Sequence, residues 1–270
     1  MIDLIIPVYN DKSNLEVALI SVAMQSIKDI INVYIIDDAS SCNYEEVIKK
    51  FSNDLKIKYF RLDKNVGAGL ARQYGISKSN SKYISFLDSD DLLYNPKSFE
   101  YLYRAICEGF DYVSSIEFDE KYNLYCDNEN CLHGKMYSRL FINKKIIKFS
   151  ETRFHEDCYF NNMILLCSPV KKTIDKVTYF YSDNENSTTS VSRAEYFSKY
   201  KELIANTRLI LDYAYSNNCK KDAVDSFVYG KQKYLRSVYS KLDESEKTQF
   251  QKWIHDYRLE QELLRFIKNS

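Results

Sequence analysis

Glycine and proline are scarce in this chain, with six and three residues among 270, so each glycine carries more information than usual. An excess of either charge is also missing, because Lys plus Arg and Asp plus Glu both number 38. Without a net field to attract a polyanion, we expect no nucleic-acid partner. The seven cysteines are odd in number and scattered, which favours reduced thiols over a disulfide framework.

Long apolar runs are missing too. No run approaches the roughly 18 residues of a membrane-spanning helix. The N-terminal residues lack the basic region and the cleavable apolar segment of a secretion signal. We therefore expect a cytoplasmic protein, and peripheral contact with the inner face of the membrane stays open.

In the first third of the chain, short apolar runs alternate with segments of helical periodicity. The runs at residues 4–8, 32–36, 57–60 and 83–87 each end in polar residues. Ser13-Asn14-Leu15-Glu16 predicts a capping box at the start of the first helix. Alternating strands and helices predict an α/β fold with a mostly parallel sheet, whose polar loops meet at its carboxyl edge, where such sheets bind ligands.

The order of elements is less regular further along the chain. We expect a helix after Pro96, strands at residues 112–118 and 178–181, and a helix at residues 156–166. From about Glu195 the apolar period is helical to the C-terminus. The sequence therefore predicts an α/β domain at residues 1–194 and a helical extension at residues 195–270.

Three carboxylates occupy four positions at the end of the fourth apolar run, in Asp88-Ser89-Asp90-Asp91. Alternation along an extended chain would turn Asp88 and Asp90 to one side, so that two carboxylates could converge on one cation. Mg²⁺ is usually held by one or two carboxylates together with substrate phosphates. A plain polar turn between a strand and a helix is the alternative, because Asp and Ser are common turn residues.

Polar loops follow the first three strands as well. The segment Pro7-Val8-Tyr9-Asn10 ends the first strand, and Asp38 follows the second, where it could also serve as a helix cap. In the loop after the third strand, Gly67 and Gly69 would let the backbone approach a phosphate or a sugar, and Arg72 adds a fixed cation. A dinucleotide-binding loop is not indicated, because the third glycine of that pattern is missing.

Together these segments resemble the inverting family 2 glycosyltransferases of the GT-A fold, over roughly residues 2–192. The resemblance implies that a cleft binds a nucleotide sugar together with Mn²⁺ or Mg²⁺. The residues that it assigns to the nucleotide sugar are Pro7, Tyr9, Asn10, Asp38, Gly67, Arg72, Asp88 and Ser89. The implied metal ligands are Asp90, Asp88 and Asp91.

The same resemblance assigns a catalytic base and an acceptor pocket. Within His155-Glu156-Asp157, Asp157 is implied as the base and Glu156 as its partner in acceptor binding. Acidic residues at a helix N-terminus are the alternative explanation of both carboxylates. The implied pocket for the sugar and acceptor contains His133, Lys135 and His155. The polar loop at residues 187–193 could close over the diphosphate or form a solvated linker.

The resemblance thus implies an inverting, non-processive, hexosyltransferase-type enzyme that moves one sugar from a UDP-linked donor to a hydroxyl of a surface glycan or glycolipid precursor. A sugar-nucleotide nucleotidyltransferase is one alternative, although it needs a glycine-rich basic loop after the first strand. A catalytically silent nucleotide-sugar binding module is another. The helices after residue 195 could form a homodimer, contact a membrane surface or simply pack together. The transferred sugar and the new linkage stay open.

Overall fold

The computed structural model describes residues 1–126, 131–183 and 193–263, with the side chains of residues 193–195 excepted. Most of the predicted loop at residues 187–193 therefore lies outside the described residues. The chain forms two compact units, one from Met1–Glu151 and Pro169–Glu185 and the other from Thr152–Ser168 and Asn186–Ser270. Among the described residues, no helix combines the length and the apolar character needed to span a membrane.

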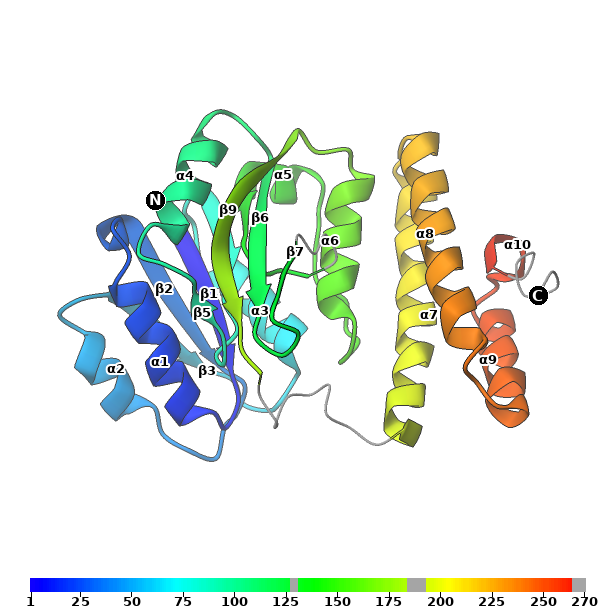
Figure 1. The fold of residues 1–270 in the computed structure, drawn as a ribbon, viewed down its shortest axis with the longest axis horizontal. Coiled ribbons are helices and arrows are strands. Elements are labelled where there is room, and N and C mark those ends of the chain that lie inside the picture. Colours follow the sequence, from blue (N-terminus) through cyan, green and yellow to red (C-terminus); the bar gives the residue numbers. More distant parts are fainter. Residues whose placement is uncertain (127–130, 184–192, 264–270) are drawn as a thin grey trace. The chain divides into compact units, whose positions relative to one another are not determined.

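The first unit, whose strands are drawn as arrows in Figure 1, is built on a mixed sheet of nine strands among the described residues. Their order is β3-β2-β1-β4-β8-β6-β9-β5, with β7 paired to β6. The strands are β1 (Ile2–Val8), β2 (Ile31–Asp37), β3 (Lys56–Arg61), β4 (Tyr83–Phe86), β5 (Leu92–Leu93), β6 (Tyr112–Asp119), β7 (Leu124–Cys126), β8 (Lys135–Ser138) and β9 (Lys171–Tyr181). Strands β1 to β4 run parallel, whereas β8 pairs antiparallel with both β4 and β6. The predicted α/β fold is confirmed. Strands β1 to β4 form its main parallel part, and β6 and β9 make a further parallel pair.

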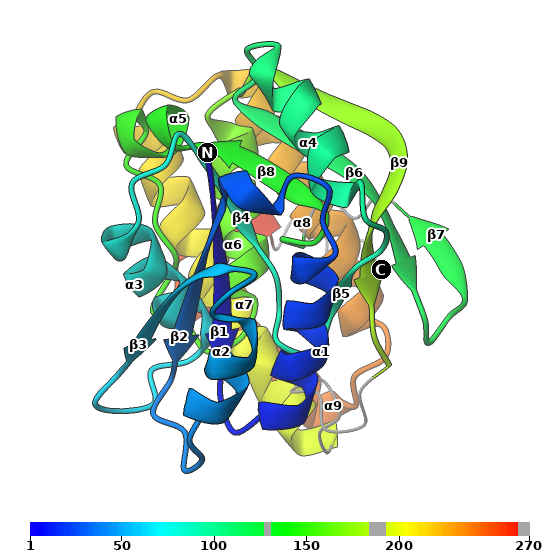
Figure 2. The same cartoon turned by 90° about the vertical axis from the view of Figure 1, so that its left-hand side faces the viewer.

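Helices cover both faces of the parallel strands. The helices of this unit are α1 (Lys12–Ala23), α2 (Glu45–Phe51), α3 (Ala68–Lys78), α4 (Ser98–Cys107) and α5 (Arg139–Lys144), with a short 3₁₀ helix at Lys28–Ile30. The apolar side chains of α1, α2 and α4 share one core with alternate residues of β1, such as Leu4 and Ile6. Helix α3 packs on β1 and β2 from the other side, as Figure 2 shows.

The predicted capping box at Ser13 is wrong. Helix α1 begins at Lys12, and its N-cap, two residues before Ser13, is Asp11, which makes no side-chain capping hydrogen bond. Ser13 is therefore already inside the first turn, where its hydroxyl cannot take the N-cap position.

The second unit is helical. Its helices are α6 (Glu156–Leu166), α7 (Arg193–Ser216), α8 (Lys221–Tyr239), α9 (Glu244–Asp256) and α10 (Glu260–Leu263). Helix α6, whose bounds agree with the predicted helix at residues 156–166, packs against α7 and α8. The compact units therefore do not follow the predicted division at residue 194, because α6 buries its apolar side in contact with helices that come later in the chain.

Candidate active site

The loops after β1 and β2 are joined by hydrogen bonds at the carboxyl edge of the parallel strands. The Asn10 backbone N–H donates to Ser40 Oγ at 2.8 Å, and the Ser41 N–H donates to Asn10 Oδ1 at 2.7 Å. Asn10 itself has a φ of 53°, a left-handed conformation that asparagine tolerates better than most residues. The Tyr9 ring beside it is 52% exposed, so one aromatic face is accessible at this edge.

Asp38 joins the loop after β2 to the loop after β3. Its two carboxylate oxygens accept hydrogen bonds from the backbone N–H groups of Val66 and Gly67, at 2.7 and 2.8 Å. Gly67 has a φ of 90°, a conformation open to glycine and strained for other residues. Asp38, predicted as a contact of the nucleotide base, is thus a buried side chain that shapes the glycine loop. Contact with the base stays a prediction.

Arg72, predicted as a cation for the nucleotide sugar, forms an ion pair with Asp88. The Nη2–Oδ1 distance is 2.5 Å, and Arg72 is buried on α3. Burial alone would raise the pKa of Asp88, but Arg72 and the nearby His133 hold the pKa well below its usual range. Asp88 is therefore ionised at neutral pH.

The carboxylates after β4 lie in a turn and not on a strand. Strand β4 ends at Phe86, and the Asp91 N–H donates to the Asp88 carbonyl at 3.1 Å. The alternation that predicted Asp88 and Asp90 on one side therefore does not apply. Among the described residues, Asp88, Asp91 and His133 bring their ligand atoms within 4.8 Å of one another. Asp90 is outside this group, so its role as a metal ligand stays a prediction.

His133, predicted for the sugar and acceptor pocket, lies with these carboxylates. Its Nδ1 is 2.8 Å from Glu117 Oε2 on β6, while its Nε2 lies 3.8 Å from Asp88 Oδ2 and 3.9 Å from Asp91 Oδ2. The imidazole is stacked on Tyr179, with the ring centroids 4.6 Å apart. Burial alone would lower the pKa of His133, but its contacts with Asp88 and Glu117 raise the pKa to about 10.

Asp91 is oriented by two hydrogen bonds, one from a side chain of β9 and one from the backbone of the residue that follows β9. Tyr179 Oη donates to Asp91 Oδ2 at 2.7 Å, and the Ser182 N–H donates to Asp91 Oδ1 at 2.9 Å. Burial together with the neighbouring Asp88 and Asp90 raises the pKa of Asp91 to about 8, although His133 acts in the opposite direction. Four ionisable side chains therefore interact with one another in a single cluster, namely Asp88, Asp91, Glu117 and His133.

Glu117 and Tyr179 were not singled out by sequence reasoning. Glu117 is one of two carboxylates in the strand Tyr112–Asp119, and its place between the apolar Ile116 and Phe118 was the available signal. Tyr179 gave no signal in a chain with 24 tyrosines.

The remaining predicted residues of this unit have internal partners. Lys135 is buried on β8, and its Nζ donates to the His133 carbonyl at 3.1 Å. The Ser89 hydroxyl donates to Asp11 Oδ2 at 3.4 Å. Pro7 lies inside β1, opposite Ile36 of β2.

His155, Glu156 and Asp157 belong to the second unit, where they begin α6. His155 is the N-cap residue with a φ of 61°, and Glu156 and Asp157 form the first turn. Among the described residues His155 Nε2 has no hydrogen-bond partner, and burial lowers the pKa of this imidazole. Asp157 Oδ1 accepts from the Cys158 N–H at 2.6 Å. The roles of base and acceptor contact stay predictions.

Two side chains of α7 hold the segment that leads into α6. The buried Asn206 donates through Nδ2 to Thr152 Oγ1 at 2.9 Å and to the His155 carbonyl at 3.3 Å. Glu202 Oε2 accepts from the Phe154 N–H at 2.8 Å. Sequence reasoning missed both residues, because they lie in a helical stretch that resembled no known family.

Comparison with known proteins places this site in context. The model of the family described as Glycosyl transferase family 2 matches residues 3–174. An uncharacterized glycosyltransferase of Rickettsia bellii (strain RML369-C) is 41% identical over 96 residues, which cover 36% of this chain and 14% of that protein. The minor teichoic acid biosynthesis protein GgaA of Bacillus subtilis (strain 168) is 27% identical over 228 residues, covering 74% of this chain and 50% of its own length.

The chain thus spans half or less of the length of these curated relatives. Among solved structures, S. aureus TarS 1-349 in complex with UDP-GlcNAc matches with a TM-score of 0.80 at 19% identity, over 95% of this chain and 80% of that one. This likeness confirms the predicted GT-A fold. The family model covers well over half of the chain, and the protein therefore belongs to glycosyl transferase family 2.

Proposed function

We propose that this protein is an inverting, metal-dependent glycosyltransferase that moves one sugar from a UDP-linked donor to a hydroxyl of a surface glycan or glycolipid precursor. The observation that carries the proposal is the convergence of His133, in the turn before β8, with Asp88 and Asp91, in the turn after β4. The TarS complex with UDP-GlcNAc supports a UDP-sugar donor. The name of GgaA supports an acceptor on the route to a cell-surface polymer.

The residues of this cluster fit a divalent cation. With Nδ1 of His133 bonded to Glu117, Nε2 lies on the side of Asp88 and Asp91, where it would bind an ion once its proton is lost. The neighbouring carboxylates already stabilise the positive charge of protonated His133. A bound cation would replace the imidazole proton and supply the positive charge in its stead. An imidazole in the set favours Mn²⁺ over Mg²⁺, which prefers oxygen ligands. Such an ion would stabilise the negative charge of the departing diphosphate.

In the proposed reaction, Asp157 accepts the proton of the acceptor hydroxyl. The acceptor oxygen forms a bond to the anomeric carbon while the bond from that carbon to the β-phosphate oxygen breaks, and UDP leaves with the electron pair. Attack from the side opposite the diphosphate inverts the anomeric configuration. Glu156 contacts the acceptor, and the exposed Tyr9 ring stacks on the base.

A donor screen tests this function. UDP-, dTDP- and GDP-sugars are incubated with the protein and Mn²⁺, and release of each nucleoside diphosphate is measured with and without EDTA. We expect release of UDP that stops with EDTA and returns with added Mn²⁺. Release of no nucleoside diphosphate from any donor would contradict the proposal.

The variant Asp157→Asn tests the base. It removes the proton acceptor, so kcat for transfer should fall by at least about 10²-fold, while UDP binding stays unchanged. Asp222→Asn is the matched control, because Asp222 is also an acidic residue in the first turn of a helix, α8, of the same unit. Unchanged transfer by Asp157→Asn would remove the base assignment.

A further inference from the structure

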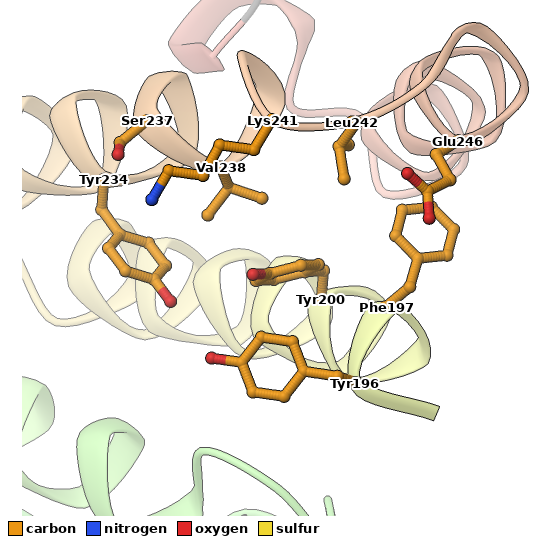
Figure 3. Close-up of a pocket in the computed structure, with 9 residues that line it drawn as sticks. All are labelled: Tyr196, Phe197, Tyr200, Tyr234, Ser237, Val238, Lys241, Leu242 and Glu246. Atoms are coloured by element: carbon orange, nitrogen blue, oxygen red, sulfur yellow. The ribbon is translucent and has the colours of Figure 1, made fainter. Parts of the chain in front are cut away.

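Helices α7, α8 and α9 of the second unit line a half-open pocket that no part of the proposed reaction uses (Figure 3). Its volume is about 440 Å³, within the range of about 300–1,000 Å³ that is common for small-ligand sites. Helix α7 contributes Tyr196, Phe197 and Tyr200, and helix α8 contributes Tyr234. Lys241, just after α8, completes the side chains considered below.

Aromatic rings in this pocket are both accessible and firmly supported. Tyr196 and Tyr234 are 44% and 43% exposed, so both residues are partly accessible to a ligand. Tyr200 meets Tyr196 edge to face, with centroids 5.6 Å apart and ring planes at 90°. Phe197 packs on Trp253 of α9, with the ring centroids 4.8 Å apart, and this contact connects the pocket to the core of the unit.

Polar groups converge between these rings. In Figure 3 the hydroxyls of Tyr196, Tyr200 and Tyr234 and the ammonium group of Lys241 point toward the same space. The pocket also contains one carboxylate, that of Glu246, which accepts a hydrogen bond from the Asp243 N–H at 3.0 Å. One ammonium and one carboxylate leave the lining without an excess of either charge.

This lining selects a class of ligand. A sugar ring presents apolar C–H groups that pack on aromatic faces and hydroxyls that both donate and accept hydrogen bonds, as tyrosine hydroxyls do. A phosphate-like anion would need an excess of cations, and a lipid chain would need walls without polar groups. The chemistry of the pocket therefore matches an uncharged sugar unit.

We propose that this pocket, lined by Tyr196, Tyr200, Tyr234 and Lys241, binds a sugar unit of a neutral glycan segment. If the chain is the transferase proposed above, that segment belongs to the acceptor, and the site holds the acceptor chain away from the reacting hydroxyl. The assignment of this segment to the acceptor depends on the proposed function, whereas the binding of a sugar by the pocket does not.

Equilibrium binding tests this inference without turnover. Maltotetraose and chitotetraose are titrated into the full chain and followed by calorimetry, with inorganic pyrophosphate as an anionic probe. We expect saturable binding of a tetrasaccharide, weakened at least about fivefold by Tyr196→Ala and by Tyr234→Ala. Tyr229→Ala is the control, because Tyr229 is on the same helix, is 70% exposed and does not line the pocket.

Four outcomes would overturn the inference. Two concern the sugar, namely no saturable binding of either tetrasaccharide, and equal losses of tetrasaccharide affinity for Tyr234→Ala and Tyr229→Ala. The others are binding of pyrophosphate alone, and variants that change the oligomeric state but keep their sugar binding. Circular dichroism of each variant checks that it is folded. Release of UDP from UDP-sugars is measured in parallel, so a failure of the donor chemistry and a failure of the pocket are distinguishable.

Discussion

At the scale of single residues, the cluster after β4 balances its charges through contacts from distant parts of the chain. Asp88 pairs with Arg72 of α3, and His133 bonds to Glu117 of β6. Without Arg72 and His133, burial would favour the neutral form of Asp88. The surrounding groups therefore keep Asp88 ionised, which is the state that the proposed metal site would need.

Glu117→Gln tests the orientation of His133. An amide is a weaker acceptor than a carboxylate and can present its NH₂ group to Nδ1, so Nε2 would be held less firmly as a ligand. We expect Mn²⁺ affinity in the presence of UDP to fall by roughly 10–100-fold, measured by calorimetry. Glu108→Gln is the control, since Glu108 is exposed and pairs only with Lys172 at 2.6 Å in the described contacts. Equal Mn²⁺ affinities for both variants would contradict the expectation.

Gly134→Ala tests the turn that carries His133. Gly134 has a φ of 58°, and an added Cβ would lie 2.6 Å from Ser115 Oγ. The variant should lose at least about 1–2 kcal/mol of stability in urea denaturation. Gly230→Ala is the opposite case, because nothing lies within 4 Å of its added Cβ on α8. It should be neutral or more stable by roughly 0.5–1 kcal/mol, and equal effects of the two variants would refute this account.

At the scale of elements, α7 does more than cover an apolar face. Its side chains Asn206 and Glu202 bond to the backbone of the segment before α6. That segment includes His155, whose φ of 61° is unfavourable for a residue with a Cβ and needs support from its surroundings. The helical extension therefore positions the turn that bears Asp157.

Asn206→Ala tests this positioning role. Loss of the donated hydrogen bonds should let the turn relax, and kcat for transfer should fall by roughly 10–100-fold with little change in the KM of the donor. Asn217→Ala is the control, because the side chain of Asn217, just after α7, bonds only to the Tyr213 carbonyl in the described contacts, at 2.9 Å. If the two variants have equal kcat, Asn206 is no positioning residue. The pH dependence of kcat separates a displaced base from a general loss of folded protein.

At the scale of the whole molecule, the two units cannot be separated by one cut. The chain leaves the first unit at Thr152, forms α6, and returns to the first unit at Pro169 before it enters the second unit again. Strand β9, which supplies Tyr179 as a partner of Asp91, therefore lies after α6 in sequence.

A truncation after residue 194 tests this organisation. It removes most of α7 and all of α8, so the buried α6 side chains Phe160, Met163 and Ile164 would become exposed. We expect lower soluble yield and a lower thermal unfolding temperature than for the full chain. A fragment 1–194 that is soluble and unfolds at the same temperature would show that α6 does not need its partners.

The sequence alone determined the order of strands and helices in the parallel half, the helix at residues 156–166 and the position of the polar loops, because apolar periodicity and strand ends are local properties. Only the tertiary structure decided which carboxylates converge. A turn after Phe86 brings Asp91, and not Asp90, together with Asp88, and His133 comes from the turn before β8, which pairs antiparallel with β4. The contact of Asn206 with the turn before α6 was equally beyond local reasoning. Such contacts join residues far apart in the chain, so strand register and helix packing set them, and no spacing in the sequence records them.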